Sequence, residues 1–157
     1  MATVTPPDGA RPDGQVGAEG ITRSKGKTAV RTGHAPPPGG AYSQAIRAGE
    51  FIFLSGQTPR DLNRQVIEGT FEDQVRKVIE NLAAVAEAAG SSLADAVNVR
   101  VYLREWDKFP QMDKVFRDMF PEPRPSRTAL VSDLPVEIEI EAVLWTGGDG
   151  HPSHDAG

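Results

Sequence analysis

Residues 136–145, with the sequence VEIEIEAVLW, constrain the fold of this chain more than any other segment. Side chains along a β-strand point alternately to opposite faces, so residues two positions apart share a face. The alternation yields an apolar face and an acidic face: Ile138, Ile140, Ala142 and Leu144 on the first, and Glu137, Glu139 and Glu141 on the second. The segment therefore predicts a sheet with one face against a core and the other face polar.

Five further segments have the composition of strands: KTAVRT (27–32), YSQAIRAG (42–49), FIFLSG (51–56), VNVRVYLR (97–104) and TALVS (128–132). Because residues 51–56 are almost wholly apolar, we expect that strand to be central. Gly49 and Glu50 predict a tight hairpin turn before it. In the segment 97–104 the two faces alternate, with Val97, Val99, Val101 and Leu103 on one and Asn98, Arg100, Tyr102 and Arg104 on the other.

Two helices are predicted from apolar residues that recur every three or four positions. The first covers residues 72–90, where Thr70 and Asp73 form a capping-box pattern and Gly90 is a natural stop. Its apolar positions are Val75, Val78, Ile79, Leu82, Val85, Ala86 and Ala89. The second is expected to start near Asp107 as N-cap and to run to Phe120. Its apolar stripe is Phe109, Met112, Phe116, Met119 and Phe120.

The order of elements, β-β-β-α-β-α-β-β, predicts an α+β fold: a mixed six-stranded sheet with two helices on its apolar face. Tyr102, Val143 and Trp145 lie among the charges on the other face, so we expect a homo-oligomer that covers it. The domain should span residues 24–146. Residues 1–23, rich in Pro, Gly and Asp, and residues 147–157 predict a flexible extension and a flexible tail.

The composition of the chain excludes several kinds of binding and catalytic site. A net charge of −5 argues against a surface that grips nucleic-acid phosphates broadly. The chain has no cysteine, which excludes disulfides, thiolate nucleophiles and cysteine-bound zinc and fits a cytoplasmic location. No apolar run of 18 residues occurs, so no membrane partner is expected. His34 lies in a predicted loop, and His151 and His154 lie in the tail, so we assign no metal.

Two charged features have both a structural and a functional interpretation. The three glutamates would form cross-strand ion pairs if the strand 97–104, with Arg100 and Arg104, lies beside them. Alternatively, one glutamate is catalytic. Arg127, which follows three prolines, is either an edge-strand arginine in solvent or a clamp for a substrate carboxylate. Periodicity alone leaves both questions open.

The ordered series GAYSQAI, FLSGQTP, VYLREWDKFPQMDKVF, PSRTALV and LPVEIEIEAV resembles the Rid family of reactive intermediate deaminases, also called YjgF-type or endoribonuclease L-PSP proteins. The resemblance covers about residues 33–146. It implies a chorismate-mutase-like fold and a homotrimer whose sheets form an inner barrel, with sites between adjacent subunits. It also implies cofactor-free hydrolysis of enamines and imines such as 2-aminoacrylate and 2-iminobutanoate to 2-keto acids and ammonia.

The resemblance also assigns roles to residues. Glu139 corresponds to the glutamate that handles water and protons, and Arg127 to the arginine that holds the substrate carboxylate. Further substrate contacts correspond to the residues Tyr42, Ser55, Gly56 and Ala129. Two departures bear on substrate range: Asp113 replaces a common asparagine, and the segment after Pro135 is about two residues shorter than usual.

Two other functions stay open from the sequence. A non-catalytic trimer that binds a small carboxylate or protects proteins would keep Arg127 without needing Glu139. An RNA-cleaving or translation-inhibiting protein, as one family name suggests, would need a basic stripe with interleaved aromatic side chains, which this chain lacks.

Overall fold

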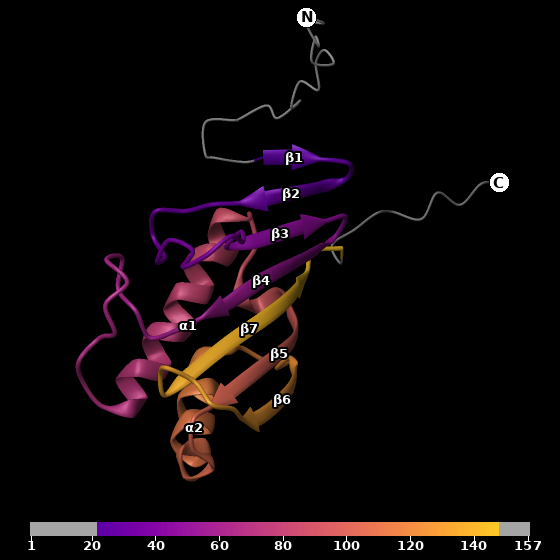
Figure 1. The fold of residues 1–157 in the computed structure, drawn as a ribbon. Coiled ribbons are helices and arrows are strands. Elements are labelled where there is room, and N and C mark those ends of the chain that lie inside the picture. The colour runs from indigo at the N-terminus through magenta and orange to yellow at the C-terminus, as the bar shows by residue number, and fades with distance from the viewer. Residues whose placement is uncertain (1–21, 148–157) are drawn as a thin grey trace, which may run out of the picture.

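The computed structural model describes residues 22–147, so the predicted extension and tail lie almost entirely outside the described residues, as do His151 and His154. The described part is an α+β domain with one mixed sheet and two helices (Figure 1). Its strands are β1 (Thr22–Ser24), β2 (Lys27–Val30), β3 (Ala45–Ala48), β4 (Phe51–Gln57), β5 (Ala96–Leu103), β6 (Ser126–Val131) and β7 (Ile138–Trp145). Its helices are α1 (Phe71–Ala88) and α2 (Phe109–Met119). Two 3-10 turns lie between them in the chain, Leu93–Asp95 before β5 and Trp106–Lys108 before α2.

The strand order is β1-β2-β3-β4-β7-β5-β6, in which only the β5–β6 pair is parallel. The nearly apolar strand β4 is in the middle, as predicted, and Gly49 and Glu50 form the two-residue turn between Ala48 and Phe51. The six expected strands are present, and β1 is a seventh that begins ahead of the predicted domain boundary. Lys25 and Gly26, both with positive φ, form the turn that pairs β1 with β2.

Helix α1 has the ends that its sequence predicts. The side chain of Thr70 accepts from the backbone N–H of Asp73, and the carboxylate of Asp73 accepts from the N–H of Thr70. At the other end Gly90, with φ of 73°, donates to Glu87, and Ser91 donates to Ala86. These two bonds complete a Schellman motif, which satisfies carbonyls that the helix leaves unpaired.

The start of helix α2 differs from the prediction. Lys108, not Asp107, is the N-cap, and the residues before it form the 3-10 turn Trp106–Lys108. Pro110 lies in the first turn of the helix, where a missing N–H costs nothing and its fixed φ favours helix initiation. Trp106 stacks on Phe109 with ring centroids 4.8 Å apart, which holds the turn against the helix.

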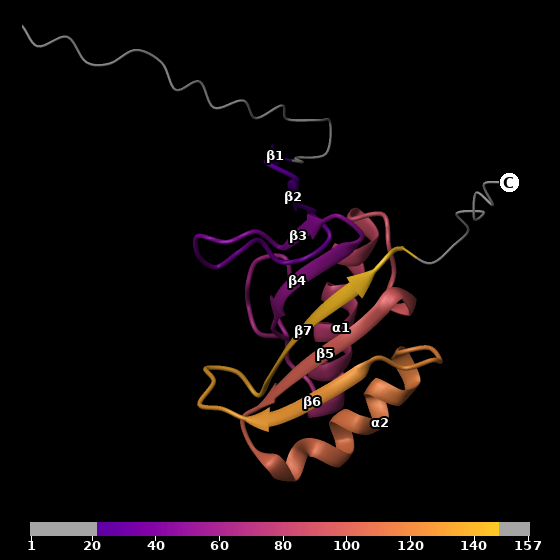
Figure 2. The same ribbon diagram turned by 90° about the vertical axis from the view of Figure 1, so that its right-hand side faces the viewer.

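Both helices lie on the same face of the sheet, as Figure 2 shows, and they enclose the core. The inward side chains of β7 (Ile138, Ile140, Ala142 and Leu144) are all buried there. The outer face is partly apolar, with Phe51, Phe53 and Trp145 between 40% and 49% exposed. One predicted inward residue is wrong: a bulge between Ala96 and Asn98 leaves Val97 40% exposed, and Ala96 takes the buried position.

Candidate active site

The acidic face of β7 is built by antiparallel pairing with β5, which sets Arg100 opposite Glu141 and Tyr102 opposite Glu139. Arg100 pairs with Glu141 at 2.8 Å, and Arg104 pairs with Glu137 at 3.5 Å. Cross-strand pairing therefore explains two of the three glutamates. It does not explain Glu139, because the residue opposite it is a tyrosine.

Among the described residues, Glu139 has no ion pair and no side-chain hydrogen bond. Its side chain is half-buried. Burial, and secondly the negative charge of Glu141, raise the pKa of the Glu139 carboxyl above its usual value. A carboxyl whose pKa moves towards neutrality exchanges protons more effectively near pH 7 than an ordinary glutamate does.

A second bulge brings the backbone of β4 against Glu139. The register between β4 and β7 shifts between Leu54 and Gln57, so Ser55 and Gly56 together occupy one position of the ladder. A methyl group at Gly56 would overlap the carboxylate of Glu139, so glycine lets that side chain keep this position against the backbone.

A cavity of about 160 Å³ opens beside Glu139. It brings together three of the predicted site residues: Tyr42, Gly56 and Glu139. Tyr42 is half exposed, and its hydroxyl accepts from the N–H of Gly39 at 3.0 Å. The rest of the lining was not predicted and comprises Pro36, Pro37, Pro38, Gly39, Gln44, Gln57, Thr58, Arg60 and Arg64.

Ser55 is not among the residues that line this cavity. Its hydroxyl donates to the carbonyl of Ser43 at 2.6 Å, and its N–H donates to the carbonyl of Gln44 at 3.0 Å. Both donors of Ser55 are therefore used within the fold, where they fasten β4 to the segment that carries Tyr42.

Gln44 is a supporting residue that the sequence analysis missed. Its side chain is 2% exposed, accepts from Thr32 at 2.8 Å, and donates to the carbonyl of Pro36 at 2.9 Å. These bonds hold the proline-rich wall of the cavity. A glutamine in a predicted strand is normally a surface residue, so only its burial identifies this role.

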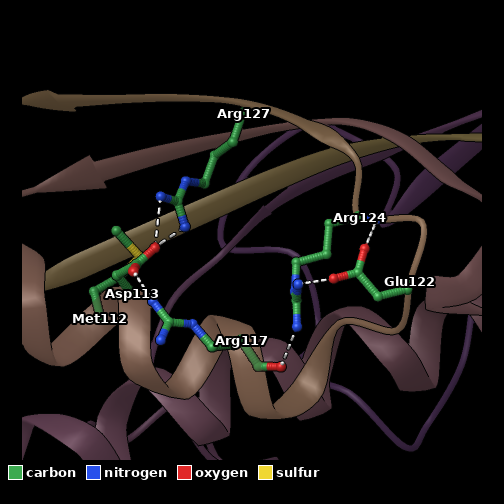
Figure 3. Close-up of polar contacts among 6 residues, drawn as sticks. All are labelled: Met112, Asp113, Arg117, Glu122, Arg124 and Arg127. Carbon is green, nitrogen blue, oxygen red and sulfur yellow. Dashed lines mark hydrogen bonds and ion pairs between the residues drawn. The ribbon is translucent and has the colours of Figure 1, made fainter.

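Arg127 lies away from this cavity, on β6, and its side chain extends towards Asp113 of α2, as Figure 3 shows. It is on an edge strand of the sheet, but its side chain is only 20% exposed, so the expectation that it lies in solvent is wrong. The guanidinium pairs with Asp113 at 2.8 Å and lies over the rings of Phe116 and Phe109, at 4.6 Å and 5.4 Å from their centroids. Ala129, two residues further along β6, is half-buried against the core.

Asp113 holds two arginines at once, because it also pairs with Arg117 at 3.0 Å (Figure 3). The hydrogen bond from Arg127 is the largest cause that lowers the pKa of Asp113, so this carboxylate is ionised at neutral pH. A substrate carboxylate would have to share Arg127 with it. Because of Asp113, Arg127 is not a free guanidinium that could bind a carboxylate without competition.

The two halves of the predicted site do not meet within one chain. Arg127 faces a hollow of about 360 Å³ lined by Asp113, Phe116, Arg117, Arg124, Pro125 and Arg127. No residue of that lining belongs to the Glu139 cavity. Among residues 22–147 there is no cluster of three potential metal ligands, and no helix is long and apolar enough to cross a membrane.

Comparison with known proteins shows extended similarity. The family described as endoribonuclease L-PSP matches residues 32–144. A RutC family protein of Pyrococcus horikoshii is 46% identical over 76% of this chain and 98% of its own length. A protein of Dermatophagoides farinae named 2-iminobutanoate/2-iminopropanoate deaminase is 33% identical over 75% of this chain and 95% of its own. The crystal structure of RidA from an Antarctic Psychrobacter species matches with a TM-score of 0.71 and 38% identity over 74% of this chain and 98% of that one.

Proposed function

The chain belongs to the endoribonuclease L-PSP family, and from this premise we propose that it hydrolyses 2-imino acids and their enamine tautomers to 2-keto acids and ammonia without a cofactor. One observation carries the proposal. Of three glutamates on one strand face, Glu139 alone has no ion-pair partner among the described residues, and it lies in a cavity against Gly56 with a raised pKa. The deaminase named among its relatives supports the same reaction.

The proposed chemistry is the addition of one water to a carbon–nitrogen double bond. Glu139 holds the water and takes one of its protons as the oxygen attacks the imine carbon. It returns that proton to the nitrogen, which gives a carbinolamine. It then takes the hydroxyl proton as the carbon–nitrogen bond breaks and passes it to the departing nitrogen, so that a 2-keto acid and ammonia leave. Such acid–base catalysis contributes about 10²–10⁴-fold.

Arg127 is proposed to hold the substrate carboxylate, with Tyr42, Ser55, Gly56 and Ala129 completing the site. Because Arg127 and Glu139 line separate hollows of one chain, the site needs a second copy that brings its Arg127 to the first copy's Glu139. The exposed aromatic residues on the outer sheet face support a homotrimer, since a large apolar face is usually covered by another subunit. We place the reaction in the cytoplasm.

The test is to generate 2-iminobutanoate in situ with a threonine dehydratase and to trap it with semicarbazide while the protein is titrated. We expect 2-ketobutyrate to form faster and semicarbazone to decrease. Arg127→Ala should abolish the acceleration. Glu139→Gln should keep binding of 2-ketobutyrate and lose about 10²–10⁴-fold in turnover.

Glu137→Gln is the matched control, because Glu137 is on the same strand face but paired with Arg104. If this variant is as damaged as Glu139→Gln, the acidic face acts collectively and the role given to Glu139 is wrong. If the wild type binds 2-ketobutyrate without accelerating hydrolysis, the protein is the non-catalytic carboxylate-binding trimer.

A further inference from the structure

Arg60 and Arg64 are two charged residues of the Glu139 cavity that the proposed reaction does not use. Both lie in the connection between β4 and α1. That connection is held in place, because Asn81 of α1, which is 1% exposed, donates to the carbonyls of Thr58 and Arg60 at 3.2 Å and 3.0 Å. The two arginines therefore start from a backbone anchored on the core.

The tip of the connection is also ordered by its own bonds. The carboxylate of Asp61 accepts from the N–H groups of Asn63 and Gln65, both at 2.9 Å. Arg60 donates to the carbonyl of Arg64 at 2.7 Å, so the two residues are tied to each other. The side chain of Arg64 reaches Gly39 on the opposite wall of the cavity, where a methyl group would overlap it.

The positive charge of these two arginines is not neutralised by any carboxylate in the part of the chain that the structure describes. Six other arginines there form ion pairs: Arg76, Arg100, Arg104, Arg117, Arg124 and Arg127. Arg60 and Arg64 do not, although Glu139 lines the same cavity. Two guanidinium groups beside a small cavity, without a protein counter-ion, are suited to hold a carboxylate through charge-assisted hydrogen bonds.

We propose that Arg60 and Arg64 bind a second carboxylate of the substrate, so that 2-imino dicarboxylic acids are preferred over imino acids with an uncharged side chain. The inference rests on the proposed function, in which Arg127 of a neighbouring copy holds the first carboxylate. The second carboxylate takes no part in the reaction. Water adds to the imine carbon, ammonia leaves, and a 2-keto dicarboxylate is the product.

The experiment compares two five-carbon substrates that differ only in the terminal carboxylate. 2-Iminoglutarate is generated from glutamate and 2-iminopentanoate from norvaline, each by an amino-acid oxidase with catalase present. Hydrolysis is followed by competition with semicarbazide. We expect kcat/KM to be higher for 2-iminoglutarate. We expect Arg64→Gln and Arg60→Gln to lower kcat/KM about tenfold or more with that substrate and less than about twofold with 2-iminopentanoate.

Two further variants separate charge from structure. Arg60→Lys keeps the charge and should retain most of the preference. Arg76→Gln removes an arginine of α1 that pairs with Asp118 and does not line the cavity. It should leave kcat/KM unchanged with both substrates. If Arg60→Gln and Arg64→Gln lower kcat/KM equally with both substrates, the proposal is overturned, because the arginines would then act on the part that the two substrates share. Unchanged kinetics would overturn it as well.

A binding measurement keeps the inference separate from the deaminase proposal. By calorimetry the wild type should bind 2-ketoglutarate more tightly than 2-ketopentanoate, and Arg64→Gln should remove the difference. If neither imine is hydrolysed faster but this difference is present, the proposed function fails and the carboxylate subsite stands. If both keto acids bind equally, the subsite is refuted whatever the kinetics show.

Discussion

The cavity at Glu139 and the cluster around Arg127 differ in whether their charged side chains form ion pairs. In the cavity Glu139, Arg60 and Arg64 have no ion-pair partners among the described residues. In the cluster Arg127 and Arg117 share Asp113, and Arg124 bonds to Glu122 (Figure 3). We infer from this difference that the charged groups of the cavity are directly available to a ligand and a water, whereas a ligand anion must compete with Asp113 for Arg127.

After substitution of Glu139 itself, Gly56→Ala should be the most damaging change at the cavity. The added methyl group overlaps the carboxylate of Glu139, so that side chain must move away from the position it needs. We expect deaminase turnover to fall about 10²-fold or more. The overlapped atoms belong to the end of the Glu139 side chain, which can turn away, so the denaturant midpoint should change little.

Gly33→Ala is the control for this substitution, because a methyl group at Gly33 meets no atom within 4 Å. It should leave turnover unchanged. Full activity in Gly56→Ala would mean that the contact between the bulge and Glu139 has no catalytic importance.

Asp113→Asn tests whether the cluster restrains Arg127. The amide keeps the shape of Asp113 but removes the charge that pairs with Arg127, so a substrate carboxylate no longer competes for that arginine. We expect KM for 2-iminobutanoate to fall about fivefold with little change in kcat, which corresponds to about 1 kcal/mol. KM is measured by steady-state kinetics. The matched control is Glu122→Gln, which removes the partner of Arg124 and leaves the pair of Arg127 and Asp113 intact. A higher KM would show that Asp113 positions Arg127 rather than competing for it.

Glu141→Gln should shift the pH profile. Burial is the first cause of the raised pKa of Glu139, and the charge of Glu141 is the second. Removing that charge lowers the pKa of Glu139, and the unpaired Arg100 acts in the same direction. Because the ionised form takes the proton from water, the acid limb of kcat/KM should move to lower pH. Glu137→Gln should not move it, and an equal shift in both variants would refute this account.

Arg104→Gln should have the smallest effect. The pair with Glu137 is 3.5 Å long and both side chains are substantially exposed, so its loss should change the free energy of unfolding by about 1 kcal/mol or less. A denaturant titration checks this value. A larger loss would mean that the outer sheet face is covered in solution and that the pair is buried there.

Features that depend on residues close in sequence were predicted well. Thr70, Asp73 and Gly90 define the ends of α1 because capping bonds join residues only a few positions apart. The short turn at Lys25 and Gly26, which pairs β1 with β2, also depends on neighbouring residues, but β1 was not predicted. The prediction of Asp107 as N-cap was wrong. The helix starts after Lys108, because Pro110 favours initiation there and Trp106 stacks on Phe109.

Features that depend on pairing between distant segments were predicted in part. The strand faces followed from a period of two, but the bulge at Val97 shifted one of them, since a bulge arises from how β5 fits β7. Arg60 and Arg64 carried no sequence signal of a site. Their position follows from a connection anchored by Asn81, which lies about twenty residues further along the chain.

The sequence by itself determined that three glutamates share one face of a strand, because side-chain direction alternates along any extended chain. Similarity to a family singled out Glu139 without a physical reason. The tertiary structure decided the rest: the register of β5 sets arginines opposite Glu141 and close to Glu137 but a tyrosine opposite Glu139, and the bulge of β4 brings Gly56 against it. Pairing and desolvation are set by neighbours across the sheet. Three glutamates that are equivalent in sequence therefore differ in the fold: two form ion pairs, and the one between them has no partner within residues 22–147.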